Sequence, residues 1–383
     1  MRARTLACRT LEANTNVVAW CSHPQLRHVL AVGTYQLDQA SGQRHGALEA
    51  YVWPCDEAEV EGDDGGQQAT PSSIPRATTR GLPGVFEAEW SFGSDVIATA
   101  LADGSVRLFR CSSEDATEKA ASASVCFQDL ARADLPSGLS SDALACCVAW
   151  DGPRSSLDAG PRPMHDRLAA SYSCGGVAVF QATPATLAPA LCMPEAHALE
   201  VWACAWHARS HAPSTLLWTG ADDGVLAGWD VRCDPGGFAA WKDSKSHGAG
   251  VTCIRPSPRR DWLVATGCYD EKLRVWDLRH GTRPVLAAAV ETPGGGVWRA
   301  SWHPSDPDLL ATASMQAGQC AVRLEEAAGG GAPVAGRVVC EYEHQKTLAY
   351  GIDWQRRAEG SLLASCSFYD NSLHVWSLST DRV

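Results

Sequence analysis

The segment ATGCYDEKLRVWD, residues 265–277, places an aspartate six residues before a tryptophan, with alternating polar and apolar residues between them. The segments WTGADDGVLAGWD (218–230) and LASCSFYDNSLHVWS (363–377) have the same arrangement. The aspartate and tryptophan pairs are Asp223 with Trp229, Asp270 with Trp276 and Asp370 with Trp376. Alternation indicates a strand, and a shared spacing at three separate places indicates an internal repeat.

Seven short apolar runs precede strand-like segments that end in tight turns, at a period of roughly 45 to 60 residues. Six of the runs end in a tryptophan, and they lie at Trp20, Trp90, Trp150, Trp206, 250–258, Trp302 and Trp354. Antiparallel strands repeated at this period are typical of a β-propeller. The sequence therefore predicts an all-β fold, a single seven-bladed propeller over residues 1–383. The chain is longer than one compact core usually becomes, which also favours a repeat architecture.

These segments resemble the WD-repeat family, in which each blade is a four-stranded antiparallel sheet with a tryptophan on its third strand and an aspartate in the preceding turn. The chain stops just past a third strand at HVWSLSTDRV. We therefore expect TLACRTLE, residues 5–12, to complete the last blade and close the ring, which leaves no sheet edge unpaired. Residues 56–80 are predicted to be an acidic surface insertion and residues 325–336 a Gly/Ala-rich loop.

Composition narrows the classes of partner and compartment. The net charge of −12 and the absence of a basic cluster argue against nucleic acid. The sixteen cysteines include no C-x-x-C pair and several lie in apolar runs, which favours reduced thiols in the cytoplasm. We find no signal peptide and no apolar stretch long enough to span a bilayer, so no membrane association is expected. We expect a monomer that binds no metal and no cofactor.

Three histidines precede the repeat tryptophans at a nearly constant distance. His197, His247 and His344 lie 32, 29 and 32 residues before Trp229, Trp276 and Trp376. In WD-repeat proteins a histidine at this point bonds the turn aspartate, in a chain that passes through Ser or Thr to the indole. Thr219 and Thr266 have the required position, whereas the last blade has Cys366. We interpret His197–Asp223, His247–Asp270 and His344–Asp370 as structural pairs, because buried polar groups must find partners.

Aromatic residues recur at one end of the predicted channel. Trp202, Trp298 and Tyr350 each lie four residues before the tryptophan that ends the innermost strand of their blade. The residue before each turn aspartate, which is Asp222, Tyr269 or Tyr369, is expected at the same rim, together with Arg299. A packed core does not need aromatic side chains at a solvent-facing rim, so we interpret this group as a binding site.

Several stretches resemble one WD-repeat subfamily, the diphthine methyl ester hydrolases of diphthamide biosynthesis, also called diphthine methyltransferases. The stretches GTYQL (33–37) and CSFYDNSLHVW (366–376) carry most of this resemblance. It implies hydrolysis of a methyl ester, with release of methanol, on a modified histidine of elongation factor 2 that also bears a trimethylammonium group. Aromatic faces and nearby negative charge suit such a cation. Trp202, Trp298, Tyr350, Tyr269 and Tyr369 are the candidate substrate-binding residues.

The sequence leaves the catalytic group open. Asp222 is a candidate for activating water and Arg299 or a tyrosine hydroxyl for stabilising the oxyanion, with His197 or His344 as alternatives. The usual hydrolase, metalloprotease and nucleotide-binding motifs are absent. A noncatalytic WD-repeat adaptor or scaffold for protein–protein interaction is therefore the alternative function.

Overall fold

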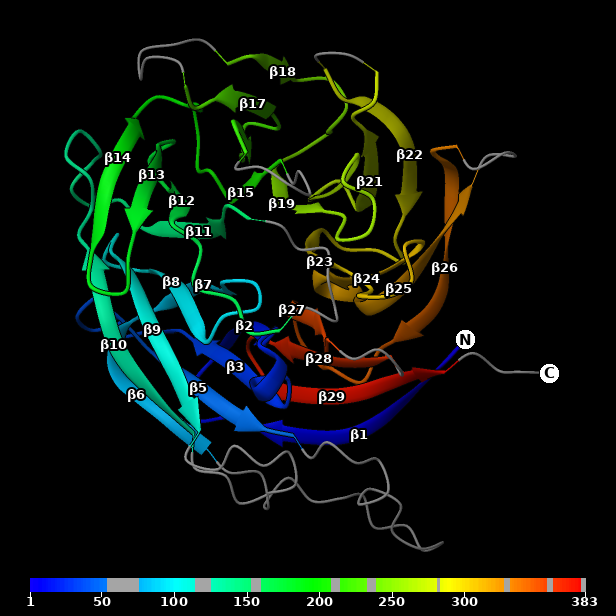
Figure 1. Cartoon of the computed structure of the whole chain (residues 1–383). Helices are drawn as coiled ribbons and strands as arrows, with labels where there is room; N and C mark the ends of the chain where they lie inside the picture. The colour runs from blue at the N-terminus through cyan, green and yellow to red at the C-terminus, as the bar shows by residue number, and fades with distance from the viewer. Residues whose placement is uncertain are drawn as a thin grey trace, which may run out of the picture.

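The alternating segments of the sequence pair into seven antiparallel sheets in the computed structural model of the chain, which describes residues 1–53, 76–113, 125–152, 160–207, 214–232, 239–280, 283–326, 331–356 and 361–379. Figure 1 shows the sheets arranged in a ring around a central axis. The all-β, seven-bladed propeller predicted from the repeat is confirmed.

Each blade is built from consecutive strands, ordered from the axis outward. The first blade contains β2 (Thr15–Trp20), β3 (Val29–Thr34), β4 (Gln36–Leu37), β5 (Arg44–Val52) and β6 (Arg76–Pro83). The second contains β7 (Val85–Trp90), β8 (Val96–Leu101), β9 (Val106–Ser113) and β10 (Val125–Ala133). The third contains β11 (Ala145–Trp150), β12 (Arg167–Tyr172), β13 (Val177–Ala182) and β14 (Leu187–Met193). In the first blade β4 is a short strand that pairs with β5 beside β3.

The remaining four blades follow the same order. They are β15 (Ala203–Trp206), β16 (Leu216–Gly220), β17 (Leu226–Asp230) and β18 (Trp241–Asp243); β19 (Val251–Pro256), β20 (Leu263–Cys268), β21 (Lys272–Asp277) and β22 (Val285–Glu291); β23 (Val297–Trp302), β24 (Leu309–Ser314), β25 (Gly318–Glu326) and β26 (Pro333–Tyr342); β27 (Ala349–Trp354), β28 (Leu362–Ser367) and β29 (Ser372–Ser379).

The N-terminal strand closes the ring. Strand β1 (Arg2–Thr10) pairs antiparallel with β29 and is the outer strand of the seventh blade (Figure 1). The predicted closure is confirmed, although the paired segment begins three residues earlier than the predicted 5–12. Because β1 occupies the outer edge of β29, the backbone groups there bond within the ring.

The tryptophans at the ends of the inner strands join neighbouring blades. Five of them donate a hydrogen bond from indole Nε1 to a backbone carbonyl at the same level of the preceding blade, at 2.8–3.0 Å. The bonds are Trp90 to Ala19, Trp150 to Glu89, Trp206 to Ala149, Trp302 to Arg255 and Trp354 to Ser301. The large rings fill the space between sheets, and the indole N–H groups satisfy carbonyls that would otherwise be buried without a partner. This repeated role accounts for the high tryptophan content.

Two predicted surface segments are shorter than expected. In the insertion predicted at 56–80, residues 56–75 lie outside the described residues and 76–80 belong to β6, which pairs with β5. An outer strand is polar, so its sequence resembles a loop. Of the loop predicted at 325–336, residues 325–326 end β25 and residues 333–336 begin β26. Gly336 suits this strand because a Cβ there would lie 2.6 Å from Val290 Cγ2 of β22.

Candidate functional site at the channel mouth

Two of the predicted rim residues lie at irregularities in the innermost strands. The pairing of β23 with β24 shifts between Val297 and Arg299, and that of β27 with β28 shifts between Ala349 and Gly351. Trp298 and Tyr350 are therefore the extra residues of two β-bulges. A bulge redirects the side chain of the extra residue, and bulges are common beside functional sites. Trp202 has a comparable position directly before β15.

Trp298 lies at the centre of the aromatic rim. Its ring centroid is 5.7 Å from that of Trp202, 5.9 Å from that of Tyr269 and 5.1 Å from that of Tyr350, with which it stacks. Trp298 is 8% exposed, whereas its three neighbours are partly exposed. The structure thus brings the three predicted inner-strand aromatics and Tyr269 into one cluster. We call these four residues the rim cluster.

A carboxylate borders the rim cluster. Asp222 Oδ1 accepts a hydrogen bond of 3.1 Å from Trp202 Nε1. The backbone N–H of Asp222 donates to the carbonyl of Glu200, a second acidic residue that sequence reasoning did not select. The charges of Asp222 and Glu200 both contribute to the raised pKa of the Tyr269 hydroxyl, although burial is the larger cause. The carboxylates of Asp222 and Glu200 therefore place negative charge at the edge of the rim cluster.

Arg299 lies beside the rim cluster and is 5% exposed. Its Cζ is 5.4 Å from the Trp298 ring centroid, and its Nη2 is 3.0 Å from Oε2 of Glu87 on β7. The same Nη2 donates to the carbonyl of Phe86 at 3.3 Å. Burial raises the pKa of the Tyr350 hydroxyl to about 12, while the charge of Arg299 opposes this rise. Arg299 reaches from the sixth blade to the second and is held across the channel.

Tyr369 does not occupy the position predicted for it. It is 66% exposed, and the ring that packs on Tyr350 is that of Phe368, at 4.9 Å between centroids. The reason is the length of the hairpin. Residues 269–271 separate β20 from β21, whereas residues 368–371 separate β28 from β29. The register differs accordingly, since Trp276 pairs with Val264 but Trp376 pairs with Leu363, and this moves the residue that faces the cluster back by one.

Further aromatic residues extend the cluster toward the second blade. Phe368 contacts Tyr35 at 5.6 Å, and Tyr35 contacts Phe86 at 5.3 Å. Phe86 is the extra residue of a bulge in β7, in the same register as Trp298 and Tyr350. Sequence reasoning missed these three residues as site residues. The signal was present, because Tyr35 lies in the GTYQL stretch and Phe368 in CSFYDNSLHVW.

The predicted polar network is complete in the fourth blade. His197 Nδ1 is 3.2 Å from Asp223 Oδ2, and its Nε2 is 2.7 Å from Thr219 Oγ1. The Trp229 indole donates to the same hydroxyl at 2.7 Å. Both ring nitrogens of His197 are engaged and the residue is 8% exposed, so the geometry does not leave it available as a catalytic base.

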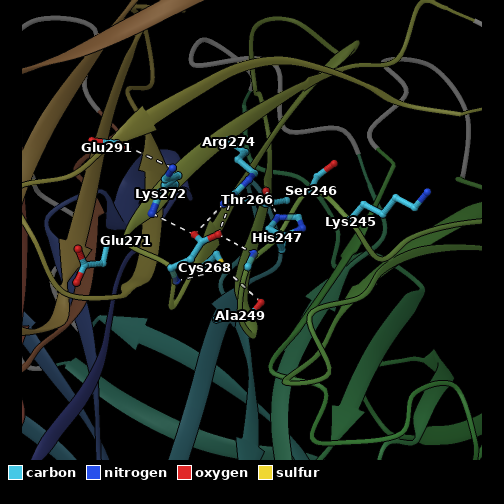
Figure 2. Close-up of polar contacts among 12 residues, drawn as sticks. Lys245, Ser246, His247, Ala249, Thr266, Cys268, Glu271, Lys272, Arg274 and Glu291 are labelled. Atoms are coloured by element: carbon cyan, nitrogen blue, oxygen red, sulfur yellow. Dashed lines mark hydrogen bonds and ion pairs between the residues drawn. The ribbon is translucent and has the colours of Figure 1, made fainter.

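The fifth blade contains a modified network. His247 Nε2 lies 3.0 Å from Thr266 Oγ1 (Figure 2). The Trp276 indole donates to that hydroxyl at 2.9 Å. Asp270 instead accepts two hydrogen bonds from Arg274, at 2.9 and 2.6 Å. The predicted His247–Asp270 bond is therefore absent, because a guanidinium two residues before Trp276 binds the carboxylate bidentately.

In the seventh blade the predicted His344–Asp370 pair is wrong. His344 is exposed and packs edge-on against Tyr342 at 4.8 Å, while Asp370 accepts from Thr347 Oγ1. Tyr342 stacks on Trp376 at 4.4 Å and bonds His374. The Trp376 indole donates to the Ser365 hydroxyl, because position 366, where the fourth and fifth blades have a threonine, is occupied by Cys366. An aromatic ring and a nearby histidine replace the polar chain, because Cys366 cannot serve as the linking hydroxyl.

The opposite mouth of the channel contains a cavity of about 900 Å³, including its opening to solvent. Its walls include the carboxyl ends of inner strands, with Trp20, Trp90 and Trp302, and the charged residues Glu89 and Asp353. The rim cluster lies at the amino ends of the inner strands and does not line this cavity. Glu87 and Arg255, which are 3.6 Å apart, line its inner part.

In the part of the chain that the structure describes, no group of three or more His, Cys, Asp or Glu side chains is arranged to hold a metal ion. None of the helices within the described ranges has the length and apolar character needed to cross a bilayer.

The comparisons with known proteins agree with the repeat and the fold. A family model described as "WD domain, G-beta repeat" matches residues 242–277. A human diphthine methyltransferase is 28% identical over 362 residues, which cover 90% of this chain and 73% of the human protein. A diphthine methyltransferase of Schizosaccharomyces pombe is 26% identical, with 93% of each chain covered.

Among solved structures, a chain of a mitotic checkpoint complex superimposes with a TM-score of 0.66 at 14% identity, covering 97% of this chain and 91% of that one. A likeness at this identity concerns the fold alone. The sequence similarity, in contrast, extends across the blades and includes relatives that share one name. The chain therefore contains a WD repeat and is similar over most of its length to proteins named diphthine methyltransferase.

Proposed function

We propose that the protein hydrolyses the methyl ester of diphthine methyl ester on elongation factor 2 and releases methanol, as a step of diphthamide biosynthesis. The names of the relatives support a role in this pathway. The observation that carries the finer assignment is the rim cluster around Trp298, with a carboxylate at its edge and a guanidinium beside it.

The rim cluster suits the trimethylammonium group of this substrate. A quaternary ammonium cannot donate hydrogen bonds, so aromatic faces and nearby negative charge are its best partners. Trp202, Tyr269 and Tyr350 are partly exposed around Trp298 and offer such faces. Asp222 and Glu200 supply negative charge at the edge. The cation would thereby fix the position of the neighbouring ester.

The chemical step requires a base for water and a donor for the oxyanion. Asp222 has one oxygen bonded to Trp202 and is partly exposed, so it can accept a proton from an attacking water. Water adds to the ester carbonyl, the carbon–oxygen bond to methoxide breaks, and the proton passes to methoxide to give methanol. Arg299 stabilises the developing oxyanion, and the carboxylic acid that forms releases its proton to solvent and becomes a carboxylate.

The alternative function is a noncatalytic adaptor. The observation that favours it is the exposure of Tyr369 and Leu199, 66% and 47%, since exposed apolar side chains are common at protein-binding surfaces. The adaptor would bind elongation factor 2 without changing it.

One assay separates the two functions. Purified protein is incubated with elongation factor 2 carrying diphthine methyl ester, and loss of the ester methyl group is followed by mass spectrometry. We expect release of methanol without a second protein. Retained binding with no loss of the methyl group would establish the adaptor and contradict the hydrolase.

The binding role of the rim cluster is tested by Trp298→Ala. This variant removes the central ring, so affinity for the methylated elongation factor should fall by about tenfold or more, as expected for an aromatic hot spot. Trp218→Ala is the control, because Trp218 is a buried tryptophan of the fourth blade that packs on Trp241 away from the rim cluster. Equal affinity of Trp298→Ala and the unmodified protein would contradict the proposed cation site.

A further inference from the structure

Two hydrogen-bond donors of the channel mouth are buried without an acceptor. The indole Nε1 of Trp298 and the guanidinium Nε of Arg299 have no hydrogen-bond partner among the described residues. Trp298 is 8% exposed and Arg299 is 5% exposed. A buried donor that lacks an acceptor is unfavourable and rare in native proteins. Two such donors on consecutive residues therefore call for an explanation.

Among the described residues the indoles of Trp20 and Trp218 also have no hydrogen-bond partner, but the indole beside Trp298 in the rim cluster is paired. Trp202, whose ring centroid is 5.7 Å from that of Trp298, donates its Nε1 to Asp222. Elsewhere in the ring, Trp302 and Trp354 donate theirs to backbone carbonyls. The N–H group of Trp298 is thus unpaired at the centre of the rim cluster, where the flanking rings already favour a cation.

The guanidinium of Arg299 is paired with Glu87, which it shares with Arg255 at 3.6 Å. Glu87 is 3% exposed and places Oε2 at 3.0 Å from Arg299 Nη2, and Phe86 supplies a carbonyl to the same nitrogen. The guanidinium is thereby fixed in position. A neutral acceptor can bind its Nε without a further counterion, whereas a carboxylate would also meet the negative charge of Glu87.

We propose that Trp298 Nε1 and Arg299 Nε together bind the carbonyl oxygen of the ligand, so that the site selects a quaternary ammonium compound with a neutral carbonyl beside the cation. This inference rests on the proposed function for the identity of the natural ligand. It gives Trp298 a second role as a hydrogen-bond donor, in addition to its aromatic face. During hydrolysis the same pair would donate to the oxygen as it becomes negative.

The test compares two small cations that differ only in the acceptor. The first probe is the dimethylamide of N-trimethylnorvaline, which has a carbonyl but no N–H donor and no ester. The second is trimethyl(2-methylheptan-4-yl)ammonium, in which an isobutyl group of similar size replaces the dimethylamide and the carbonyl is absent. Their dissociation constants for the full chain are measured by calorimetry. We expect the amide to bind about fivefold to tenfold more tightly, as two additional hydrogen bonds allow.

Three conservative variants locate the preference. Trp298→Phe keeps an aromatic face but removes the donor, and Arg299→Lys keeps the charge but removes Nε, so both should bring the two affinities to within about twofold. Trp206→Phe is the matched control, because its indole N–H donates to the Ala149 carbonyl outside the rim cluster, and it should keep the preference. Thermal unfolding of each variant shows whether the fold is retained.

The outcomes separate this inference from the proposed function. Equal binding of both probes by the unmodified protein, or full preference in folded Trp298→Phe and Arg299→Lys, would overturn the donor pair while ester hydrolysis could still be observed. Binding of neither probe would also overturn it. A clear preference together with absence of hydrolysis would support the donor pair and contradict the enzyme.

Discussion

At the scale of single residues, Asp222 is the side chain on which the chemical proposal depends most directly. Asp222→Asn keeps an oxygen that can accept from Trp202 Nε1, so the rim cluster should be preserved. Loss of the base should lower kcat for ester release by about 100-fold or more. Binding of the methylated elongation factor should weaken less than kcat falls, because the variant removes one negative charge at the edge but keeps Glu200 and the aromatic faces.

The control for this variant is Asp230→Asn in the same blade. Asp230 forms an exposed ion pair with Arg232, and its carboxylate is not part of the rim cluster. Its kcat should equal that of the unmodified protein. Full activity in Asp222→Asn would instead require another base, and Glu200 would be the next residue to replace.

Stability at acidic pH should depend on buried histidines. Burial, assisted by the charge of Arg274, lowers the pKa of His247 to about 4. In the unfolded chain a histidine has a pKa of about 6.5, so between these values the unfolded state binds the proton more readily. The contribution of His247 to stability is therefore complete above about pH 6.5 and is lost as the pH falls toward 4.

Urea unfolding at neutral pH and near pH 5 measures this effect. The free energy of unfolding should decrease at the lower pH, and His247→Gln should make the decrease smaller because it removes one titrating group. His303 and His374, whose pKa values burial also lowers to about 4, should keep part of the dependence. An identical pH dependence in His247→Gln would show that His247 does not contribute.

At the scale of structural elements, the indole bonds between blades should be measurable. Trp354→Phe removes a bond of 3.0 Å from a side chain that is fully buried and leaves the Ser301 carbonyl without its donor. We expect a loss of about 1–3 kcal/mol in the free energy of unfolding. Trp218→Phe is the matched control, since Trp218 is 1% exposed and its Nε1 has no hydrogen-bond partner among the described residues.

The comparison of these two variants isolates the hydrogen bond from the loss of ring volume. Chemical denaturation should therefore show a larger effect for Trp354→Phe than for Trp218→Phe. If the two variants lose the same free energy of unfolding, the indole rings stabilise the protein by filling space and their hydrogen bonds add no net stability.

The register of the hairpins shows how far elements could be predicted. The strand and turn pattern placed Tyr269 correctly beside Trp298, because residues 269–271 form a three-residue connection. The same rule failed for Tyr369, since the last hairpin is one residue longer. A shift of one residue reverses which side chain faces a neighbour, and the aspartate spacing alone does not reveal it.

At the scale of the whole molecule, stability should depend on closure of the ring by β1. Removal of residues 1–10 would leave the outer edge of β29 unpaired in a sheet that otherwise has four strands. Unpaired edges are prone to pair with other chains. We expect a lower Tm and concentration-dependent association in analytical ultracentrifugation, whereas the full chain should sediment as a monomer.

A synthetic peptide of residues 1–12 provides the control. Added in excess to the truncated chain, it should restore part of the Tm by pairing with β29. An unchanged Tm after truncation would show that β1 contributes little to closure.

The sequence by itself determined the repeat, the seven blades, the closing strand and the identity of the ring residues Trp202, Trp298 and Tyr350, because strand periodicity and turn chemistry are local properties of the chain. Only the tertiary structure decided which distant residues meet. The pairing of Arg299 with Glu87 joins blades that are far apart in the sequence, and the replacement of the His344–Asp370 pair depends on packing around Trp376. Contacts across a closed ring follow from its three-dimensional geometry, which no local pattern encodes.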